Sequence, residues 1–396
     1  MPEQKKYTRK LTYNERLFIV ADEICPPLLN QLFFDGEGSF DAEMWSRAVE
    51  AASEANPGSR LVLRGSLGMS RWEDSGSAPR VIEVDGSVWD GMGPDGAPFL
   101  QKRLMPRQGP TCEVLLIKGD PLRVCFRTHH AVMDGRGTLT WAEDIFRALR
   151  GEPLIGSRST LSDLELARSV QPEWRTPFPR DNIAPTGKTS GSERGVTWKR
   201  MFIPGSYNNF LGQVAVLAAR EAWKHQQGPV RFGVPVDIRF RRKGLRSTGN
   251  LSIAIYIEVR PDSTPEEIAQ DVKKQIDEKR DCMIDRWDPM IRFLPLGFLY
   301  KKGQEMILNN AAKNRYGLSG ILTNMGKIPM EIFSGGGFRA RAFWGIPPSL
   351  ENTPFFLGMA SHDHTSELIV TMPKNLAGGN RIDTVLDAIR SGLVAV

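Results

Sequence analysis

The chain alternates between stretches with hydrophobic residues at helical spacing and stretches with the spacing and composition of β-strands. Helices are expected at residues 39–52, 138–149, 209–224, from 264 onward, and at 383–394. Strands are expected at residues 60–67, 80–84, 113–118, 122–128, 230–236, 251–259, and around residues 320, 340, 356 and 368. Ser39 or Asp41 can cap the first of these helices, and Thr264 followed by a proline can cap a later one. The pattern therefore predicts an α/β protein with mixed sheets flanked by helices.

The pattern of elements stops between about residues 172 and 194, where proline, asparagine, threonine, glycine and serine dominate. Such a segment is typical of a linker or crossover loop. We therefore expect an N-terminal subdomain at residues 1–180, a linker at 181–195 and a C-terminal subdomain at 196–396. Two domains also fit the length of 396 residues, at roughly 100 to 200 residues per domain.

The candidate chemistry lies in the stretch His129-His-Ala-Val-Met-Asp-Gly135, which holds two of the five histidines in the chain. A strand precedes it and a helix is expected after it, with Gly135-Arg-Gly137 as a break between them. The histidines therefore lie at a strand end, where loops carry functional residues. An imidazole that titrates near neutrality can take a proton from an attacking hydroxyl or amine and later return it.

The two histidines are expected to have different roles, because successive residues of a strand point to opposite faces. We choose His130 as the general base and His129 as a structural, hydrogen-bonded side chain. Asp134 can either orient the base directly or hold the loop by pairing with an arginine from elsewhere in the chain. Gly135 would allow the backbone to turn tightly at that point.

The complete string His-His-x-x-x-Asp-Gly resembles the signature of the chloramphenicol acetyltransferase and nonribosomal-peptide condensation-domain superfamily. This resemblance implies that His130, the second histidine, is the catalytic base and that Asp134 makes a structural salt bridge with an arginine. The segment Gly233-Val-Pro-Val-Asp-Ile-Arg239 is similar to the Gly-x-Pro-x-x-x-Arg element of condensation-like proteins, which points to Arg239 as that partner. Leu322-Thr-Asn-Met-Gly326 is similar to an element that lines the active-site channel, which implies that Thr323 and Asn324 lie along the channel and that Thr323 contributes a hydroxyl near the oxyanion.

The three matches extend over most of the chain and imply a fold of two similar chloramphenicol-acetyltransferase-like halves with the active-site tunnel between them. They also imply acyl transfer from a thioester, either acyl-coenzyme A or an acyl or peptidyl carrier protein, to a small-molecule hydroxyl or amine acceptor in secondary or lipid metabolism. No permanently bound cofactor is expected. The segment Arg341-Ala-Phe-Trp-Gly-Ile346 lacks the aspartate and first glycine of the Asp-Phe-Gly-Trp-Gly latch of condensation domains. With no adenylation or carrier domain in the chain, a free-standing acyltransferase is therefore favoured.

Two alternatives stay open at this stage. The first is a condensation-like protein that recruits a carrier-tethered substrate without transfer chemistry, which the altered latch favours slightly and the intact histidine pattern disfavours. The second is an enzyme in which the same base serves amide formation, cyclisation, dehydration or epimerisation on a tethered substrate. Neither the acyl chain nor the acceptor follows from the sequence, and the oligomeric state is equally open.

Composition narrows the classes of partner. The net charge of +6 suits phosphate-bearing ligands without requiring them. The only dense basic run, Arg239–Arg246, lacks the support expected of a nucleic-acid binding face, so no nucleic acid is expected. We expect Arg239 to be buried against Asp134 and the other cations of the run to form a solvated loop. The less favoured alternative is that these cations attract phosphates.

Other patterns carry less weight. The four scattered cysteines indicate neither a zinc site nor a disulfide framework, which fits a reducing cytoplasm. The polar N-terminus and the absence of an apolar run of about 18 residues predict no leader and no membrane span. The segment His362-Asp-His364 has a spacing that a metal could use, but it lies where a solvated hairpin turn is expected, so no metal site is expected.

Overall fold

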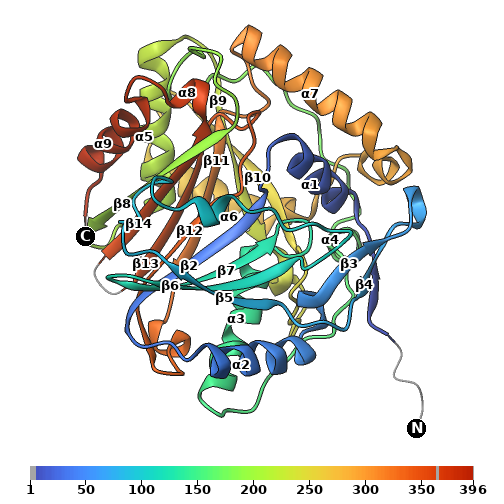
Figure 1. The fold of residues 1–396 in the computed structure, drawn as a ribbon. Coiled ribbons are helices and arrows are strands. Elements are labelled where there is room, and N and C mark those ends of the chain that lie inside the picture. The colour runs from blue at the N-terminus through green and yellow to red at the C-terminus, as the bar shows by residue number, and fades with distance from the viewer. Residues whose placement is uncertain (1–5, 363–364, 396) are drawn as a thin grey trace.

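The computed structural model describes residues 6–362 and 365–395, which form two sheet-and-helix halves that pack side by side (Figure 1). The five-stranded sheet of the N-terminal half has the strand order β12-β2-β7-β6-β5. Its strands are β2 (Leu29–Gly38), β5 (Arg80–Asp85), β6 (Cys112–Lys118), β7 (Leu122–His129) and β12 (Phe338–Ile346). Two helices, α2 (Ala42–Ala55) and α3 (Gly135–Leu149), cover one face of this sheet with a core rich in aromatic side chains.

The six-stranded sheet of the C-terminal half has the order β10-β9-β11-β13-β14-β8. Its strands are β8 (Val196–Pro204), β9 (Val230–Asp237), β10 (Ser252–Val259), β11 (Gly320–Lys327), β13 (Phe356–His362) and β14 (Thr365–Pro373). The helices of this half are α5 (Phe210–His225), α6 (Pro265–Asp277), α8 (Lys374–Ala377) and α9 (Arg381–Gly392). Helices α5 and α9 lie together on this sheet, at the upper left of Figure 1, and enclose a second hydrophobic core.

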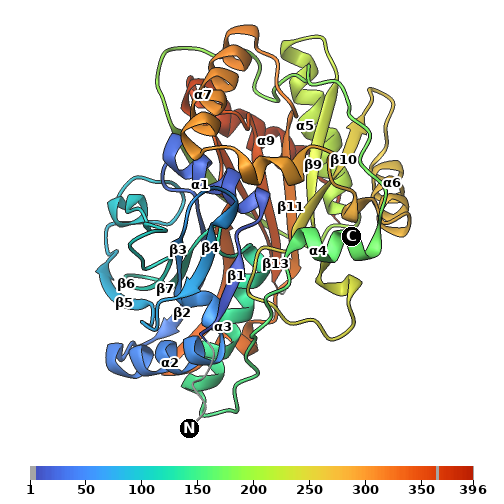
Figure 2. The same ribbon diagram turned by 90° about the vertical axis from the view of Figure 1, so that its right-hand side faces the viewer.

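The remaining elements lie around the junction of the two halves. A small sheet contains β1 (Thr8–Lys10), β3 (Leu61–Arg64) and β4 (Arg71–Asp74) in the order β1-β4-β3. Helix α1 (Tyr13–Ile24) of the N-terminal half packs against α7 (Leu296–Lys313) of the C-terminal half, as the side view of Figure 2 shows. Helix α4 (Asp163–Val170) precedes the long irregular segment between the halves. Each helix of the described chain is too short or too polar to cross a bilayer.

Strand β12 joins the two halves, because it comes from the C-terminal part of the chain and pairs antiparallel with β2. Asp35 of β2 holds this junction together. Its carboxylate accepts hydrogen bonds from the Trp344 indole at 2.8 Å and from Arg200 of β8 at 2.9 Å, and Arg200 also binds Glu367 of β14. The segment that lacks the latch signature therefore still connects the halves. The predicted boundaries at residues 180 and 195 stay a prediction.

The expected fold class, mixed sheets in two similar halves, is confirmed, with differences in detail. The N-cap of α2 is Asp41, not Ser39, since its carboxylate accepts hydrogen bonds from two backbone amides of the first turn. The expected strand at 60–67 ends at Arg64, and a short 3-10 helix, η2 (Leu67–Met69), follows after Gly65 and Ser66. The expected break at residues 135–137 is wrong: these residues form the first turn of α3, because Asp134 caps the helix one residue earlier.

Candidate active site

The start of the histidine loop is held by hydrogen bonds between its backbone and three different segments. The His129 amide donates to the Thr111 carbonyl at 2.8 Å, and the His130 amide donates to the Leu28 carbonyl at 3.1 Å. The His130 carbonyl accepts a hydrogen bond from the Asn250 side chain at 2.9 Å. Because Asn250 belongs to the C-terminal half, the loop lies where the two halves meet. The position of the His130 backbone thus depends on both.

His130 is a partly buried side chain whose ring packs against Phe18 of α1, with 4.2 Å between the ring centroids. Its Nδ1 atom is enclosed and forms no hydrogen bond with a described residue. This leaves Nε2 as the nitrogen that a ligand can approach. Burial lowers the pKa of His130 to about 4, although the charge of Asp134 acts in the opposite direction. The imidazole is therefore neutral, and able to accept a proton, at neutral pH.

His129 is fully buried. Its Nδ1 accepts a hydrogen bond from the Ala131 amide at 3.1 Å, so the ring proton lies on Nε2, which is 3.6 Å from the Asp22 carboxylate of α1. Asp22 also accepts hydrogen bonds from the Leu28 amide at 2.8 Å and from Arg103 at 2.7 Å. These contacts tie the end of α1 to the histidine loop.

Asp22 is a site residue that the sequence analysis did not identify. Burial alone would raise its pKa, but the interactions with His129, the Leu28 amide and Arg103 outweigh burial and lower the pKa to about 2. The carboxylate is therefore charged at all ordinary pH values. The capping box of α1, in which Thr12 and Glu15 bind each other's backbone amides, was the available sequence signal for this helix.

Asp134 and Arg239 lie together although they are 105 residues apart, and both are buried. Two guanidinium nitrogens of Arg239 donate to the two carboxylate oxygens of Asp134 at 3.0 and 3.1 Å. The same carboxylate accepts the Gly137 amide at 2.6 Å and the Leu251 amide at 2.7 Å. Burial raises the pKa of Asp134. The Arg239 charge and these hydrogen bonds have the larger, opposite effect, so the net result is a pKa below the usual value.

These contacts decide between the two roles that the sequence left open for Asp134. Its oxygens bind an arginine, two backbone amides and the Ser252 hydroxyl, and none of these bonds goes to the imidazole of His130. Asp134 therefore holds the loop and caps α3 in the described structure. Arg239 continues the network to the Ser247 carbonyl at 2.9 Å and to the Gly249 carbonyl. The network fixes the loop that carries Asn250.

Gly137 is a second residue that the sequence analysis passed over. A Cβ atom at this position would lie 2.8 Å from the carbonyl carbon of Thr248 and closer still to its oxygen. Gly135, the glycine that the sequence pointed to, has room for a Cβ, which would only meet the Met325 methyl group at 3.4 Å. Gly135 also has no positive φ. The close approach between α3 and the loop at 247–250 therefore requires Gly137.

Thr323 and Asn324 lie on β11, whose end approaches the start of α3 through Met325. Thr323 is partly buried, whereas Asn324 is exposed and its side-chain oxygen accepts the Gly326 amide at 2.9 Å. Within residues 6–362 and 365–395, no hydrogen bond links either side chain to the histidine loop. A role for either residue in the channel stays a prediction.

The basic run at Arg239–Arg246 is less solvated than expected. Arg241 binds the fully buried Asp281 with two hydrogen bonds of 2.6 and 3.0 Å, and Arg246 binds Glu143 at 2.9 Å as well as Asp144. The expectation of a solvated loop is therefore wrong for these two arginines, and it holds for Arg242 and Lys243, which are largely exposed. A cavity of about 560 Å³ lies beside the Asp134–Arg239 pair, between α3 and this run, and Arg136 and Lys327 line it.

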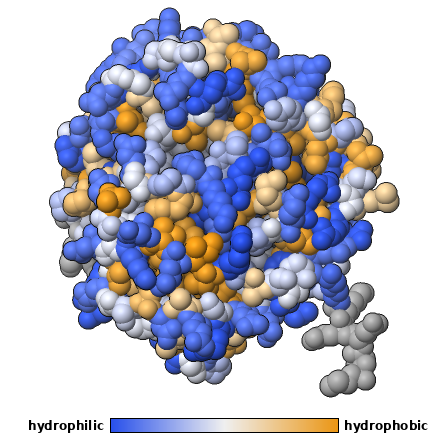
Figure 3. Space-filling model, in the orientation of Figure 1, coloured by the Kyte–Doolittle hydropathy of each residue, from blue (hydrophilic) through white to orange (hydrophobic). Residues whose placement is uncertain are grey.

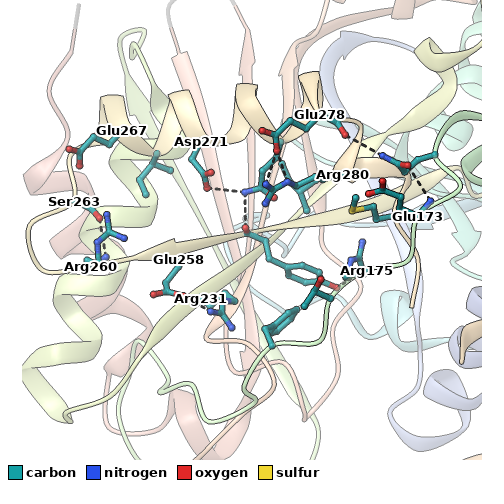
Figure 4. Close-up of a pocket in the computed structure, with 18 residues that line it drawn as sticks. Glu173, Arg175, Arg231, Glu258, Arg260, Ser263, Glu267, Asp271, Glu278 and Arg280 are labelled. Carbon is teal, nitrogen blue, oxygen red and sulfur yellow. Dashed lines mark hydrogen bonds and ion pairs between the residues drawn. The ribbon is translucent and has the colours of Figure 1, made fainter. Parts of the chain in front are cut away.

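A larger cavity, of about 840 Å³, lies at the outer edge of the C-terminal sheet (Figure 4). It is bounded by β10, α6 and the segment that follows α4, and its lining does not include His130. Arg175 donates to the Ala254 carbonyl at 2.8 Å and Gln275 donates to the Tyr256 carbonyl at 2.8 Å, so side chains cover the open edge of β10. Such covering is a common protection against pairing with another strand.

The segment His362-Asp-His364, where a solvated turn and no metal site were expected, is only partly described. His362 is buried at the end of β13, 3.4 Å from Glu367, rather than in a solvated turn. Asp363 and His364 lie outside the described residues. Among the residues that are described, no group of three or more histidine, cysteine, aspartate or glutamate side chains has the arrangement of a metal site.

Comparison with known proteins identifies the fold. No protein-family model and no curated protein sequence matches the chain. A variant of the starter condensation domain of rhizomide synthetase RzmA, solved in complex with C8-CoA, is similar with a TM-score of 0.69 and 14% identity, over 97% of this chain and 94% of that one. The condensation domain of the monacolin K polyketide synthase MokA has a TM-score of 0.63 and 12% identity, over 97% and 96% of the two chains.

The epimerization domain from the third module of tyrocidine synthetase B is also similar, with a TM-score of 0.56 and 14% identity, over 98% of this chain and 96% of that one. The chain therefore has the two-lobed condensation-domain fold over nearly its whole length. The fold that the histidine pattern implied is confirmed. Because this fold occurs in both condensation and epimerization domains, the activity has to be argued from the site.

Proposed function

We propose that the protein is an acyltransferase that moves an acyl group from a thioester to a hydroxyl or amine acceptor, with His130 as the general base. The observation that carries this proposal is a neutral imidazole at the junction of the two halves, where the loop backbone binds carbonyls of the N-terminal half and the Asn250 side chain of the C-terminal half. A base with a pKa of about 4 is unprotonated at neutral pH and available for proton transfer at every encounter with the acceptor.

The proposed reaction is a direct transfer without a covalent enzyme intermediate. The neutral His130 carries its ring proton on Nδ1, and Nε2 removes the proton of the acceptor O–H or N–H as the acceptor atom attacks the thioester carbonyl. The new C–O or C–N bond forms, the C–S bond breaks, and the imidazolium returns the proton to the departing sulfur. The Thr323 hydroxyl and backbone amides near it are proposed to stabilise the oxyanion.

Four further residues are proposed to position the base. His129 anchors the loop to Asp22, and Asp134 and Arg239 hold the loop against the C-terminal half through hydrogen bonds of 3.0 and 3.1 Å. Gly135 begins α3 directly after the loop. None of these residues is proposed to exchange a proton during the reaction.

The proposed donor is acyl-coenzyme A or a phosphopantetheine thioester on a carrier protein. The RzmA domain, which shares the fold, was solved with C8-CoA, and this supports an acyl thioester as co-substrate. The cavity beside the Asp134–Arg239 pair offers phosphate groups the exposed cation of Lys327 and that of Arg136, which lies 3.9 Å from Asp237 in the same lining. The acceptor is proposed to be a small molecule.

The rival function is a condensation-like protein that binds or converts a carrier-tethered substrate. The similarity to the MokA condensation domain and to an epimerization domain favours this reading. One argument for a purely binding role is weaker than the sequence suggested, since β12 still pairs with β2 and the junction is intact. A protein that only recruits partners would also not need a neutral imidazole whose Nδ1 is enclosed.

The experiment is free-thiol release from a panel of acyl-coenzyme A donors, mixed with alcohol and amine acceptors, for the wild type and His130→Ala. His225→Ala is the matched control, because His225 is an exposed histidine at the end of α5. We expect acceptor-dependent release that the control retains and His130→Ala loses by at least about a hundredfold. Release that persists in His130→Ala contradicts the mechanism. If coenzyme A donors give none, acyl-carrier proteins as donors separate a carrier-dependent transferase from a binding protein.

A further inference from the structure

Large apolar side chains gather on one exposed face beside α1. Six of them form what we call the apolar face: Leu67, Met69, Trp287, Met290, Phe293 and Phe298. They come from η2, from the 3-10 helix η6 (Asp288–Phe293) with the residue before it, and from the start of α7. Met69 is 75% exposed and Trp287 is 74% exposed, although Trp is among the residues that proteins usually cover. Contiguous exposed patches of this kind mark interaction surfaces.

Two of the segments that carry the apolar face, η2 and η6, lie against each other. An atom added at the Cβ position of Gly68, between Leu67 and Met69, would lie 3.3 Å from the Phe293 ring. The buried Arg16 of α1 joins the two segments, since its guanidinium donates to the Leu67 carbonyl at 3.1 Å and to the Leu294 carbonyl. Figure 3 shows hydrophobic residues at the right-hand margin, where Figure 1 has the turn between β3 and β4 and one end of α7.

Cations predominate among the exposed charges along this face. Between residues 286 and 302, every one of which is described, the exposed charged side chains are Arg286, Arg292, Lys301 and Lys302. Asp288 is the one acidic residue of that stretch and is half-buried. Lys302 binds the partly exposed Glu305 of α7 at 2.7 Å, which leaves Arg286, Arg292 and Lys301 to create a positive potential around the apolar side chains.

We propose that the apolar face binds the surface of an anionic phospholipid bilayer. Aromatic and aliphatic side chains that enter the boundary between headgroups and acyl chains, with cations that contact anionic headgroups, are the two components of peripheral membrane binding. The aromatic, methionine and arginine side chains of this face suit a lipid surface and a protein interface alike, and the exposed lysines, which protein interfaces are depleted in, favour the lipid surface. This inference does not depend on the acyltransferase proposal.

Membrane binding would bring the bilayer close to the histidine site. Phe18 of α1 packs against His130, and the neighbouring Leu17 is exposed on the same helix, which also contacts η6. Helix α1 therefore contacts both the histidine site and η6.

The test is co-sedimentation of the purified protein with phosphatidylcholine vesicles that contain or lack phosphatidylserine. We expect binding to the anionic vesicles that weakens as salt is added. Trp287→Ser with Phe293→Ser should lower the partition coefficient at least about tenfold. Arg292→Glu with Lys301→Glu should lower it by more than about fivefold for each residue. Phe202→Ser is the matched control, because Phe202 is 61% exposed on β8, at the far edge of the C-terminal sheet.

Unchanged thermal unfolding midpoints show that the variants are folded, because all substituted side chains are exposed. The proposal is overturned if the wild type sediments no more with anionic vesicles than without vesicles, or if Phe202→Ser weakens binding as much as the variants of the apolar face. It is also overturned if Trp287→Ser with Phe293→Ser converts a dimer to a monomer in the absence of lipid, which would make the face a self-association surface.

Discussion

Replacement of Gly137 by alanine is the most direct test of the contact between α3 and the loop that holds His130. The added Cβ would lie 2.8 Å from the Thr248 carbonyl carbon and closer still to its oxygen, so the loop must withdraw by at least about 0.7 Å to bring the carbon to the ~3.5 Å of an ordinary contact. The same loop carries Asn250, which binds the His130 carbonyl at 2.9 Å. A shift of this size therefore strains the bond that positions the base.

The magnitude follows from a comparison with Gly135→Ala. Both glycines lie in the first turn of α3, so both substitutions gain up to about 1 kcal/mol of helix propensity. Only Gly137→Ala also creates a backbone clash, which costs about 1 to 3 kcal/mol. Gly137→Ala should therefore have a free energy of unfolding about 2 kcal/mol lower than that of Gly135→Ala. Since misplacement by about 1 Å can cost a hundredfold in rate, its thiol release should fall at least about tenfold.

The assay is urea unfolding of both variants, followed by fluorescence, together with thiol release under identical conditions. The Met325 methyl group, 3.4 Å from the position of a Cβ on Gly135, belongs to a flexible side chain and can move. Gly135→Ala should therefore match the wild type within about 1 kcal/mol. Equal stability and equal turnover of the two variants would refute the argument that the loop packs tightly on Gly137.

Three further predictions concern titration and ion pairing. Burial lowers the pKa of His130 to about 4, so the rate of thiol release should stay level down to about pH 5.5 and fall through about pH 4. A rate that already falls near the unperturbed histidine pKa of about 6.5 would contradict this. Asp134→Asn leaves Arg239 without its buried partner and should cost about 3 to 5 kcal/mol in urea unfolding, whereas Asp237→Asn, which removes the 34% exposed partner of the same arginine, should cost no more than about 1 kcal/mol. The pKa of Asp22 is lowered to about 2, so its contribution of about 2 kcal/mol to the free energy of unfolding is present above about pH 4 and is lost as the pH falls toward 2. Asp22→Asn should remove this acid dependence of stability. An unfolding profile against pH that equals that of the wild type would show the assignment to be wrong.

The histidine loop and its arginine were predictable because both lie in short patterns of residue types. The pattern around Asp134 and the pattern that ends at Arg239 each name a residue, and the structure brings them together across 105 positions. Helix α6 was equally visible, since Thr264 and Glu267 form a capping box at its start. Local signals of this kind do not depend on the rest of the fold.

Strand β2 escaped the sequence analysis because its burial pattern shows no alternation. Eight consecutive residues of this strand are buried, and Asn30, Gln31 and Asp35 are among them. A polar residue in a buried strand is stable only with a partner, and these partners are distant in sequence. Asn30 donates to the Met133 carbonyl at 2.7 Å, and Asp35 accepts from Trp344 and Arg200. Such a strand can be recognised only after the tertiary contacts are known.

The sequence analysis missed the role of Gly137 and the pairing of β12 for a related reason, since both depend on residues that are distant in the sequence. One depends on a carbonyl from a loop more than a hundred residues away, and the other joins Phe338–Ile346 to Leu29–Gly38. In β12 the Trp344 indole finds its acceptor on β2 rather than in its own segment. The missing aspartate of the latch signature therefore did not indicate a missing connection.

The pairing of β12 with β2 has a consequence for the order of events during synthesis. When the ribosome has completed the first half of the chain, the edge of β2 has no partner, because β12 begins only at Phe338. Unpaired strand edges in nascent chains favour aggregation. The N-terminal half should therefore be a client of chaperones until most of the protein has left the ribosome, and a fragment that ends near residue 180 should accumulate as insoluble material.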